Sequence, residues 1–507
     1  MNDPQPIPQD PARGAGARRR SRWSSLLGTA LILTAGYYVG GLILRPQRRV
    51  IESAAAMLLF YIASRMTIYQ SLAFFLVVYP FPTFTSVGST NTLILTTITI
   101  LWLIRMSARE LTFSLRSILT PFLPVVAIGY LLSTYSMHSP EEIQGGLGVL
   151  FDVLACFFLY YMVVNFVRDE KALKRTLLFF GISSILIHLV SVYEAIFPGR
   201  AFLEGWLIGE RTRFISAKYG QRTGGPFRDF ELLSEYCAVT TPILLFMWLR
   251  AERRSRIFWG IILGLTVFSQ FATVTRGGFI SLGIGVVYLT WLLRKEIGLS
   301  RAIGSLAVAA TAITVIGLFL PHVFRMESLF SRLEKTKFEH GVPDSRVGAW
   351  GPNFKRAQEH IFIGHGPKFS VGSGLEKYSW PHNGYLFIWV TIGLIGLVGY
   401  ILLWVTCFVQ TGKYGGPLLA GPFVPGFLTA VHVSWLVFMI DQLKIDFARN
   451  PIYFIFTWFF MGITAAGCEI VRRSNETASV LKPAAIPLPV GPPALAAPVR
   501  VRKITGA

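Results

Sequence analysis

Long apolar stretches separated by short polar segments make up most of the chain. After residue 90 they cover residues 91–104, 118–135, 147–167, 176–197, 231–249, 257–275, 278–293, 302–320, 383–409, 424–440 and 451–471. A helix needs about 20 predominantly apolar residues to cross the ~30 Å hydrocarbon core of a bilayer. The pattern therefore predicts an all-α, polytopic membrane protein with a bundle of about 12–14 transmembrane helices and one long polar loop.

The two ends of the chain are less regular. Residues 1–22 are rich in Pro, Gly and Arg, which is typical of a disordered segment held at the cytoplasmic face. The apolar stretch from Leu26 to Leu44 has no convincing small-residue cleavage site, which indicates an uncleaved anchor. Residues 51–82 form either two tilted spans or one long span. Residues 474–507 are rich in Pro and Ala, and we expect a disordered cytoplasmic tail there.

The charges between the apolar stretches predict the orientation of the helices. Lys and Arg are concentrated in four connections, at residues 105–116, 168–175, 250–256 and 294–301. Such basic connections face the cytoplasm in membrane proteins. The intervening segments then face the other side, and they are residues 137–146, 198–230, 275–277 and 321–382. The last of these is too polar to lie in hydrocarbon, where backbone groups find no water.

Composition narrows the class of protein further. The chain has 507 residues, of which 52% are hydrophobic and 15% charged, whereas soluble proteins average about 25% charged residues. The net charge of +21 comes from Lys and Arg between apolar stretches, which favours cytoplasmic loops over a nucleic-acid surface. All four cysteines lie in apolar surroundings without paired spacing, so we expect buried thiols. No segment has the spacing of a metal site or a nucleotide-binding loop, and we expect no cofactor.

Three polar side chains stand at the boundaries of the outer segments. Arg276 in TRGGF ends one apolar stretch and opens the next, beside two glycines. A guanidinium at this depth either faces an anion site or extends to the interface. Arg346 in DSRVGAW fits an ordinary surface helix when it is considered alone. His382 in WPHNGYL lies where the long loop re-enters the membrane, and its imidazole can exchange a proton near neutral pH.

A second basic outer segment precedes the apolar stretch at residue 231. This segment carries five cations before Glu231, and such an excess of positive charge on the outer face needs a compensating partner. They are Arg211, Arg213, Lys218, Arg222 and Arg228. An acidic lipid-linked substrate and ordinary lipid headgroups are both suitable partners. We therefore predict Arg222, Arg228 and Glu231 as substrate contacts, together with Trp350 and Asn383, which accompany Arg346 and His382 in their motifs.

The order of these motifs resembles the O-antigen ligase and polymerase superfamily of bacterial envelope glycan assembly. TRG follows one span, Ser345-Arg346 and Trp350 with an IGHG element occupy the long loop, and HNGYLFIWVTIGLIGLVGY opens the next span. The similarity covers roughly residues 221–399. It implies a metal-independent glycosyltransferase with a type C-like helical fold in residues 23–473, in the bacterial inner membrane, with the segments 198–230 and 321–382 in the periplasm.

By this resemblance the donor is a glycan on undecaprenyl diphosphate and the acceptor is a glycan or a lipid. Arg276 and Arg346 match the arginines that hold the diphosphate, and His382 matches the histidine that assists transfer. Ligases and polymerases of this superfamily use the same kind of lipid-linked donor, so both activities remain open. The sequence also allows a transporter or flippase for lipid-linked glycan, or a non-catalytic assembly protein. Charges at span ends favour a one-sided site over a path across the bilayer.

Overall fold

The computed structural model describes residues 64–82, 84–85, 88–107, 113–197, 222–324, 338–339, 342–367 and 381–481, with isolated residues near positions 60, 202 and 334. Within this part of the chain, 10 helices are long and apolar enough to cross a membrane. They are α4 (Thr90–Ser107), α6 (Pro140–Phe166), α7 (Glu170–Ile196), α8 (Phe230–Arg250), α9 (Arg253–Ala272), α10 (Arg276–Ile297), α11 (Leu299–Phe324), α14 (Gly384–Tyr414), α15 (Phe423–Asp441) and α16 (Pro451–Leu481).

Shorter elements complete the described architecture. The helix α3 (Ile68–Val78) is apolar, as is α5 (Leu123–Ser133), which continues into η1 (Thr134–Ser136). The helix α13 (Asp344–Glu359) is polar, and η3 (Gly225–Phe227) and η4 (Phe447–Arg449) are single turns. Two minimal antiparallel pairs join β1 (Phe84–Thr85) to β2 (Gly88–Ser89) and β3 (Phe338–Glu339) to β4 (Val342–Pro343). The predicted polytopic all-α membrane protein is therefore confirmed.

Two predicted boundaries fall inside helices. Helix α11 continues past Pro321 to Phe324, and α16 continues past the expected end of the domain at residue 473 to Leu481. In α16 the extension is supported by ion pairs one turn apart, from Arg472 to Glu469 at 2.7 Å and from Arg472 to Glu476 at 3.1 Å. The predicted N-terminal segment, the anchor at Leu26–Leu44 and the tail beyond Leu481 lie outside the described residues.

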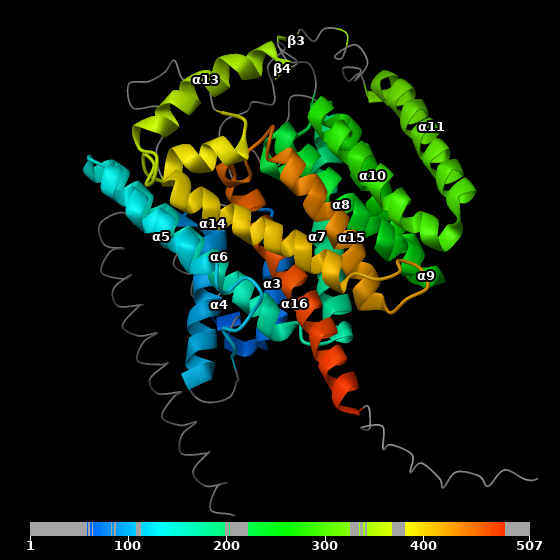
Figure 1. Ribbon diagram of the computed structural model, residues 1–507, viewed down its shortest axis with the longest axis horizontal. Helices are drawn as coiled ribbons and strands as arrows, with labels where there is room; N and C mark the ends of the chain where they lie inside the picture. Colours follow the sequence, from blue (N-terminus) through cyan, green and yellow to red (C-terminus); the bar gives the residue numbers. More distant parts are fainter. Residues whose placement is uncertain are drawn as a thin grey trace, which may run out of the picture.

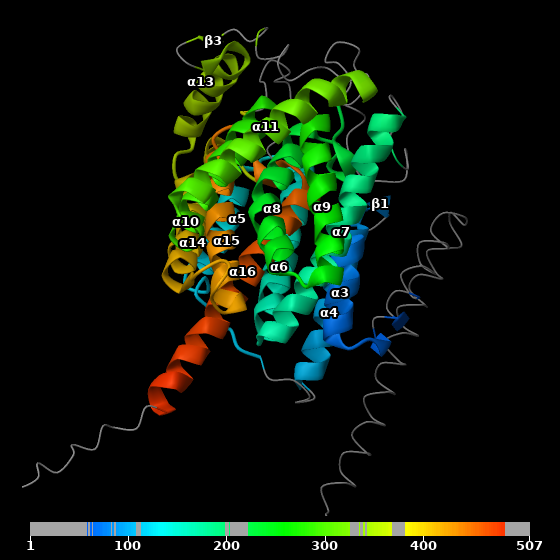
Figure 2. The same cartoon turned by 90° about the vertical axis from the view of Figure 1, so that its right-hand side faces the viewer.

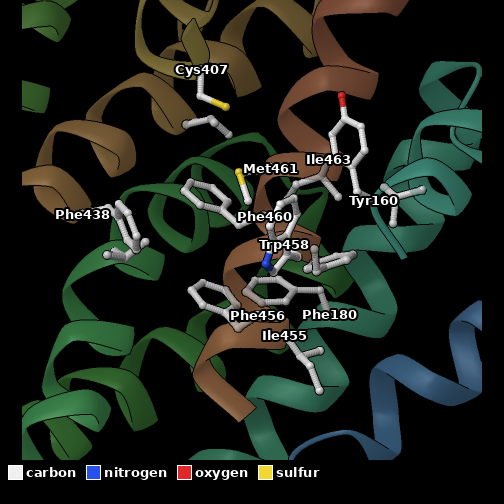
Figure 3. Close-up of a cluster of buried hydrophobic side chains, with 14 of the residues drawn as sticks. Tyr160, Phe180, Cys407, Phe438, Ile455, Phe456, Trp458, Phe460, Met461 and Ile463 are labelled. Atoms are coloured by element: carbon white, nitrogen blue, oxygen red, sulfur yellow. The ribbon is translucent and has the colours of Figure 1, made fainter. Parts of the chain in front are cut away.

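The core of the bundle is formed by α8, α15 and α16. Of the apolar window of α16, 89% is buried, against 6% for α11, which stands at the edge of the bundle (Figure 1). Aromatic side chains of α16 fill the centre, as Figure 3 shows for Phe456, Trp458 and Phe460. Phe460 stacks on Trp435 of α15, with ring centroids 4.5 Å apart. All four cysteines are free and buried, as expected. A helix buried on most sides positions its ends rigidly, because close-packed interiors have little room to shift.

One end of the bundle gathers the polar elements. Helices α8, α10, α14 and α16 begin at this end and α15 finishes at it, while the basic connections at residues 250–256 and 294–301 lie at the other ends of α8 and α10. Figures 1 and 2 show α13 above this end and the C-terminal part of α16 projecting from the opposite one. We call the first the polar end of the bundle. The alternation agrees with the orientation that the charge pattern predicts.

Helix α14 is broken near its first third. Ile392 and Gly393 have non-helical backbone angles, with φ of 71° at Gly393. The IFIGHG segment fills the break. The amides of His365 and Gly366 donate to the carbonyls of Val390 and Thr391, each at 2.8 Å, and the Leu394 amide donates to the Ile361 carbonyl at 2.8 Å. Backbone groups freed inside a membrane protein need such internal partners.

We expect Gly393→Ala to destabilise the protein by about 3 kcal/mol or more. A Cβ at Gly393 would lie 2.1 Å from the Phe362 carbonyl oxygen, and its positive φ disfavours any L side chain. Gly264→Ala in α9 is the matched control, because a Cβ there meets nothing within 4 Å. Thermal unfolding in detergent, followed by tryptophan fluorescence, measures both variants. Equal melting temperatures of the Gly393→Ala and Gly264→Ala variants would show that the break at Gly393 does not contribute to stability.

Candidate functional site

His382 lies at the polar end, directly before the N-cap of α14. Its Nδ1 is 3.1 Å from Oε2 of Glu231, in the first turn of α8. Arg449 in η4 approaches the same nitrogen, with NH1 at 3.5 Å. The φ of His382 is +47°, in the left-handed region that side chains rarely occupy. Such backbone strain persists only where the surroundings hold it, and it concentrates at functional sites.

The carboxylates around His382 are held by Arg449. One of its terminal nitrogens donates to Oδ2 of Asp229 and also lies 3.3 Å from Oε2 of Glu231. Asp229 is in turn the N-cap of α8, because its Oδ1 accepts from the Glu231 amide at 2.8 Å. Burial acts to lower the pKa of Arg449, but the carboxylates of Asp229, Asp446 and Glu231 outweigh it and raise the pKa above its usual value. Arg449 therefore remains a cation that fixes both acids.

Arg276 is the first residue of α10, in a tight turn after α9. This turn contains Val274 at φ +48°, another strained position of the described chain. Arg222 holds it, because its Nε donates to the Thr273 carbonyl at 3.0 Å and one terminal nitrogen donates to the Val274 carbonyl at 2.9 Å. Its guanidinium also lies 3.6 Å from the ring centroid of Phe230. Arg222, predicted as a substrate contact, is therefore buried and bonded to the backbone of this turn.

A small cavity connects the Arg276 turn to the partner of His382. It has a volume of about 40 Å³ and is lined by Glu231, Glu235, Thr275, Gly277, Gly278, Asp441, Lys444 and Ile445. Thr275 and Gly277 flank Arg276, while Glu231 bonds His382. The Oε2 of Glu235 and the Oδ2 of Asp441 are buried without a hydrogen-bond partner among the described residues. A cavity of this size has room for water that would satisfy them.

Arg346 and Trp350 both belong to α13. The backbone of Arg346 lies in the first turn of this helix, and its side chain falls outside the described part of the structure. Trp350 is half-buried, and its indole Nε1 has no hydrogen-bond partner among the described residues. The helix docks on α14 through an edge-on contact of Phe354 with Trp389, whose ring centroids are 5.5 Å apart. These facts leave the predicted roles of Arg346 and Trp350 untested.

Asn383 and Arg228 occupy structural positions in their local elements. Asn383 is the N-cap of α14, where its Oδ1 accepts from the Leu386 amide at 3.0 Å and its Nδ2 donates to the Leu443 carbonyl at 3.3 Å. Arg228 ends η3 at φ +51° and interacts electrostatically with the buried Glu194. Both residues therefore contribute to the shape of the polar end, and their predicted contacts with substrate remain predictions.

The histidines of the IGHG region have a structural role. The rings of His360 and His365 are 4.6 Å apart, and His365 Nε2 lies 2.9 Å from the carbonyl oxygen of Arg356. Burial lowers the pKa of His365, and its Nε2–H donates this bond, because a carbonyl oxygen only accepts. Gly364 and Gly366 have positive φ, which makes the turn that their sequence indicates. No group of three or more metal-ligating side chains gathers anywhere in the described chain.

Sequence reasoning missed the charged residues contributed by the connection between α15 and α16. Arg449, Asp441 and Lys444 lie there or at the adjoining end of α15, within the segment DQLKIDFARN. Charged residues clustered between two apolar stretches were a usable signal, since such residues in membrane proteins usually pair or line a cavity. Asp229 was missed as well, although an Asp directly before an apolar stretch is typical of a helix N-cap.

Residues 261–401 match the family model described as O-antigen ligase. Over this segment the chain is similar to the O-antigen ligase family. The match confirms the resemblance to the O-antigen ligase and polymerase superfamily, and it contains Arg276, Arg346 and His382. Glu231 and Arg449, which contact His382, lie outside the matched O-antigen ligase segment and come from α8 and η4. No curated protein matches the chain.

We expect Asn383→Ala to cost about 1 kcal/mol of stability, because it removes the N-cap of α14. Asp169→Ala is the matched control at the opposite end, since Asp169 caps α7 through a 2.7 Å bond from the Ala172 amide. Each change removes one N-cap, so thermal unfolding should show that the two variants lose similar amounts of stability. A melting temperature of Asn383→Ala equal to that of the unsubstituted protein would argue against the capping role.

Proposed function

We propose that this chain is a membrane glycosyltransferase that moves a glycan from undecaprenyl diphosphate to an acceptor hydroxyl at the periplasmic face of the bacterial inner membrane. The family match supports an O-antigen ligase or polymerase type of activity in general. The observation that carries the proposal is the single cavity shared by Glu231, which bonds His382, and by Thr275 and Gly277, which flank Arg276.

His382 is the general base in this proposal. A neutral imidazole whose Nδ1–H donates to the Glu231 carboxylate, over 3.1 Å, carries its lone pair on Nε2. Nε2 then takes the proton of the acceptor hydroxyl as the oxygen attacks the anomeric carbon. The bond from that carbon to the phosphate oxygen breaks, and undecaprenyl diphosphate leaves with both bonding electrons. A positioned base of this kind contributes roughly 10²- to 10⁴-fold to the rate.

Arg276 stabilises the departing diphosphate. Negative charge develops on the leaving oxygen, and a guanidinium binds phosphate oxygens through two parallel, charge-assisted hydrogen bonds. Arg276 opens α10, and the side chain of the N-cap Thr275 makes no capping bond there. The N-terminus of a helix has a partial positive charge and exposed amides, which favour an anion at the same place. Arg346 is the second diphosphate-binding arginine by family resemblance.

The location of the charges favours a transferase over a flippase. Arg449, Lys444, Asp441 and Glu235 all lie at the polar end, and the basic connections at the other end indicate that the polar end faces the periplasm. A flippase needs polar groups along a path across the bilayer. Broken helices such as α14 also occur in transporters. Here the IFIGHG segment pairs with the backbone groups at the break, so they are not available to a passing substrate.

We expect His382→Ala, Arg276→Ala and Arg346→Ala each to lower glycan transfer at least ~10²-fold while the protein still folds and inserts. Glu231→Gln should lower it less, about 10- to 100-fold, because it acts through His382. His138→Ala and Arg254→Ala are exposed controls and should transfer normally. Transfer is measured with the purified protein, lipid-linked glycan and acceptor. Normal transfer by the three site variants would rule out the proposal.

Deleting the protein from its bacterium separates the two activities that remain open. We expect envelope polysaccharide to change in one of two ways, because a polymerase and a ligase act at successive steps. Polymer that accumulates on the lipid carrier without being ligated indicates a ligase, and single repeat units indicate a polymerase. Gel electrophoresis of the envelope polysaccharide and of the lipid-linked intermediates makes the distinction. An unchanged polysaccharide would contradict both assignments.

A further inference from the structure

Two cations hold the backbone turn that carries Arg276, one on each side. On the side of α9, Arg222 bonds the carbonyls of Thr273 and Val274, as described above. On the side of α10, Lys444 donates from Nζ to the carbonyl of Gly277. Arg276 lies between the two anchored positions. A turn that includes the strained Val274 needs such support, because left-handed backbone at a non-glycine residue is unfavourable unless its surroundings hold it.

The ammonium group of Lys444 is fully engaged in hydrogen bonds around this turn. Its Nζ contacts three oxygen atoms, namely the carbonyl of Gly277, Oγ of Ser281 and Oδ1 of Asp441. An ammonium group has three N–H donors, so these contacts use its whole capacity for hydrogen bonds. Asp441 is fully buried and balances its charge. Lys444 therefore has no N–H to offer a phosphate as long as this arrangement persists.

The fit between Lys444 and the turn is close. A Cβ built on Gly277 would lie 2.6 Å from Cδ of Lys444, so the lysine stem packs directly against the glycine. The same lysine lines the small cavity beside Thr275, Gly277 and Glu231. Lys444 therefore packs against the first turn of α10, the turn that begins with Arg276.

We propose that Lys444, paired with Asp441, is a positioning residue for the lipid diphosphate. It acts through the Gly277 carbonyl and holds Arg276 in the direction in which it binds the diphosphate. Arg222 does the same from the other side of the turn. This inference rests on the proposed function, because it takes Arg276 as the diphosphate ligand. It assigns a role to a residue that lies outside the matched O-antigen ligase segment.

The test is a double-mutant cycle on binding. The full-length protein in lipid nanodiscs binds undecaprenyl diphosphate, and Kd is measured by microscale thermophoresis. The clamp variant is Lys444→Met with Asp441→Asn, which removes both charges together because a single change would leave a buried charge unpaired. The Kd of the clamp variant is compared with the Kd of the parent protein twice, once with Arg276 in place and once in the Arg276→Gln background. Thermal unfolding of each variant establishes that it is folded.

We expect the clamp variant to weaken binding about tenfold when Arg276 is present, because small misplacements of a binding group are costly. In the Arg276→Gln background the same change should weaken binding less than about twofold, since its effect passes through Arg276. The matched control is Lys174→Met with Glu170→Gln, an exposed ion pair of 2.6 Å on α7 at the opposite end. It should leave Kd unchanged in both backgrounds.

Three results would overturn the inference. Equal weakening in both backgrounds would mean that Lys444 acts independently of Arg276, for example by direct contact with phosphate. An unchanged Kd of the folded clamp variant with Arg276 in place would mean that the clamp does not affect binding. If Arg276→Gln alone leaves Kd unchanged, the diphosphate site of the proposed function fails as well. The first two results leave that proposed site standing.

Discussion

Charged side chains buried at one end of an apolar bundle have to be neutralised by other residues of the same bundle. This constraint determines the arrangement of the polar end. Arg449 binds Asp229 and Glu231, and Lys444 binds Asp441. Buried ions without a partner are costly, and a pair with well-formed hydrogen bonds offsets most of that cost. The ends of α8, α10, α14, α15 and α16 are therefore joined to one another by charge as well as by packing.

The second constraint is that backbone groups inside a membrane protein need partners. Helix α14 is interrupted at Gly393, and the polar loop before it enters the bundle to fill the gap, with the amide of Gly366 bonded to the Thr391 carbonyl at 2.8 Å. The loop is thereby anchored at the polar end, and α13, which carries Arg346 and Trp350, is attached to α14. The interruption thus connects the segment outside the bundle to the helices that hold His382 and Arg276.

These two constraints together produce a one-sided site. The cations and acids around His382 and Arg276 lie at or near the ends of helices, and under the proposed function they hold a diphosphate at the boundary while its polyprenyl chain stays in lipid. Fixed charges in a site of low polarity act strongly on a reaction that develops charge, and they need no rearrangement as the bond breaks. Under the proposed function, this is the physical basis of glycan transfer from a lipid diphosphate.

The apolar helices, the distribution of the basic connections, and the motifs TRG, IGHG and HNGYL that indicate the family can all be read from the sequence. Apolar length and charge distribution are local properties, so they can be predicted without a fold. Which polar side chains contact one another depends on how the helices pack. His382 and Glu231 are 151 positions apart, and their contact depends on how α8 and α14 pack. Arg222 and Asn383, predicted as substrate contacts, also bond to the backbone at the ends of neighbouring helices, where unsatisfied backbone groups need partners. The contacts of Arg449 and Lys444 depend on the position of the α15–α16 connection, which lies against the ends of α8 and α10.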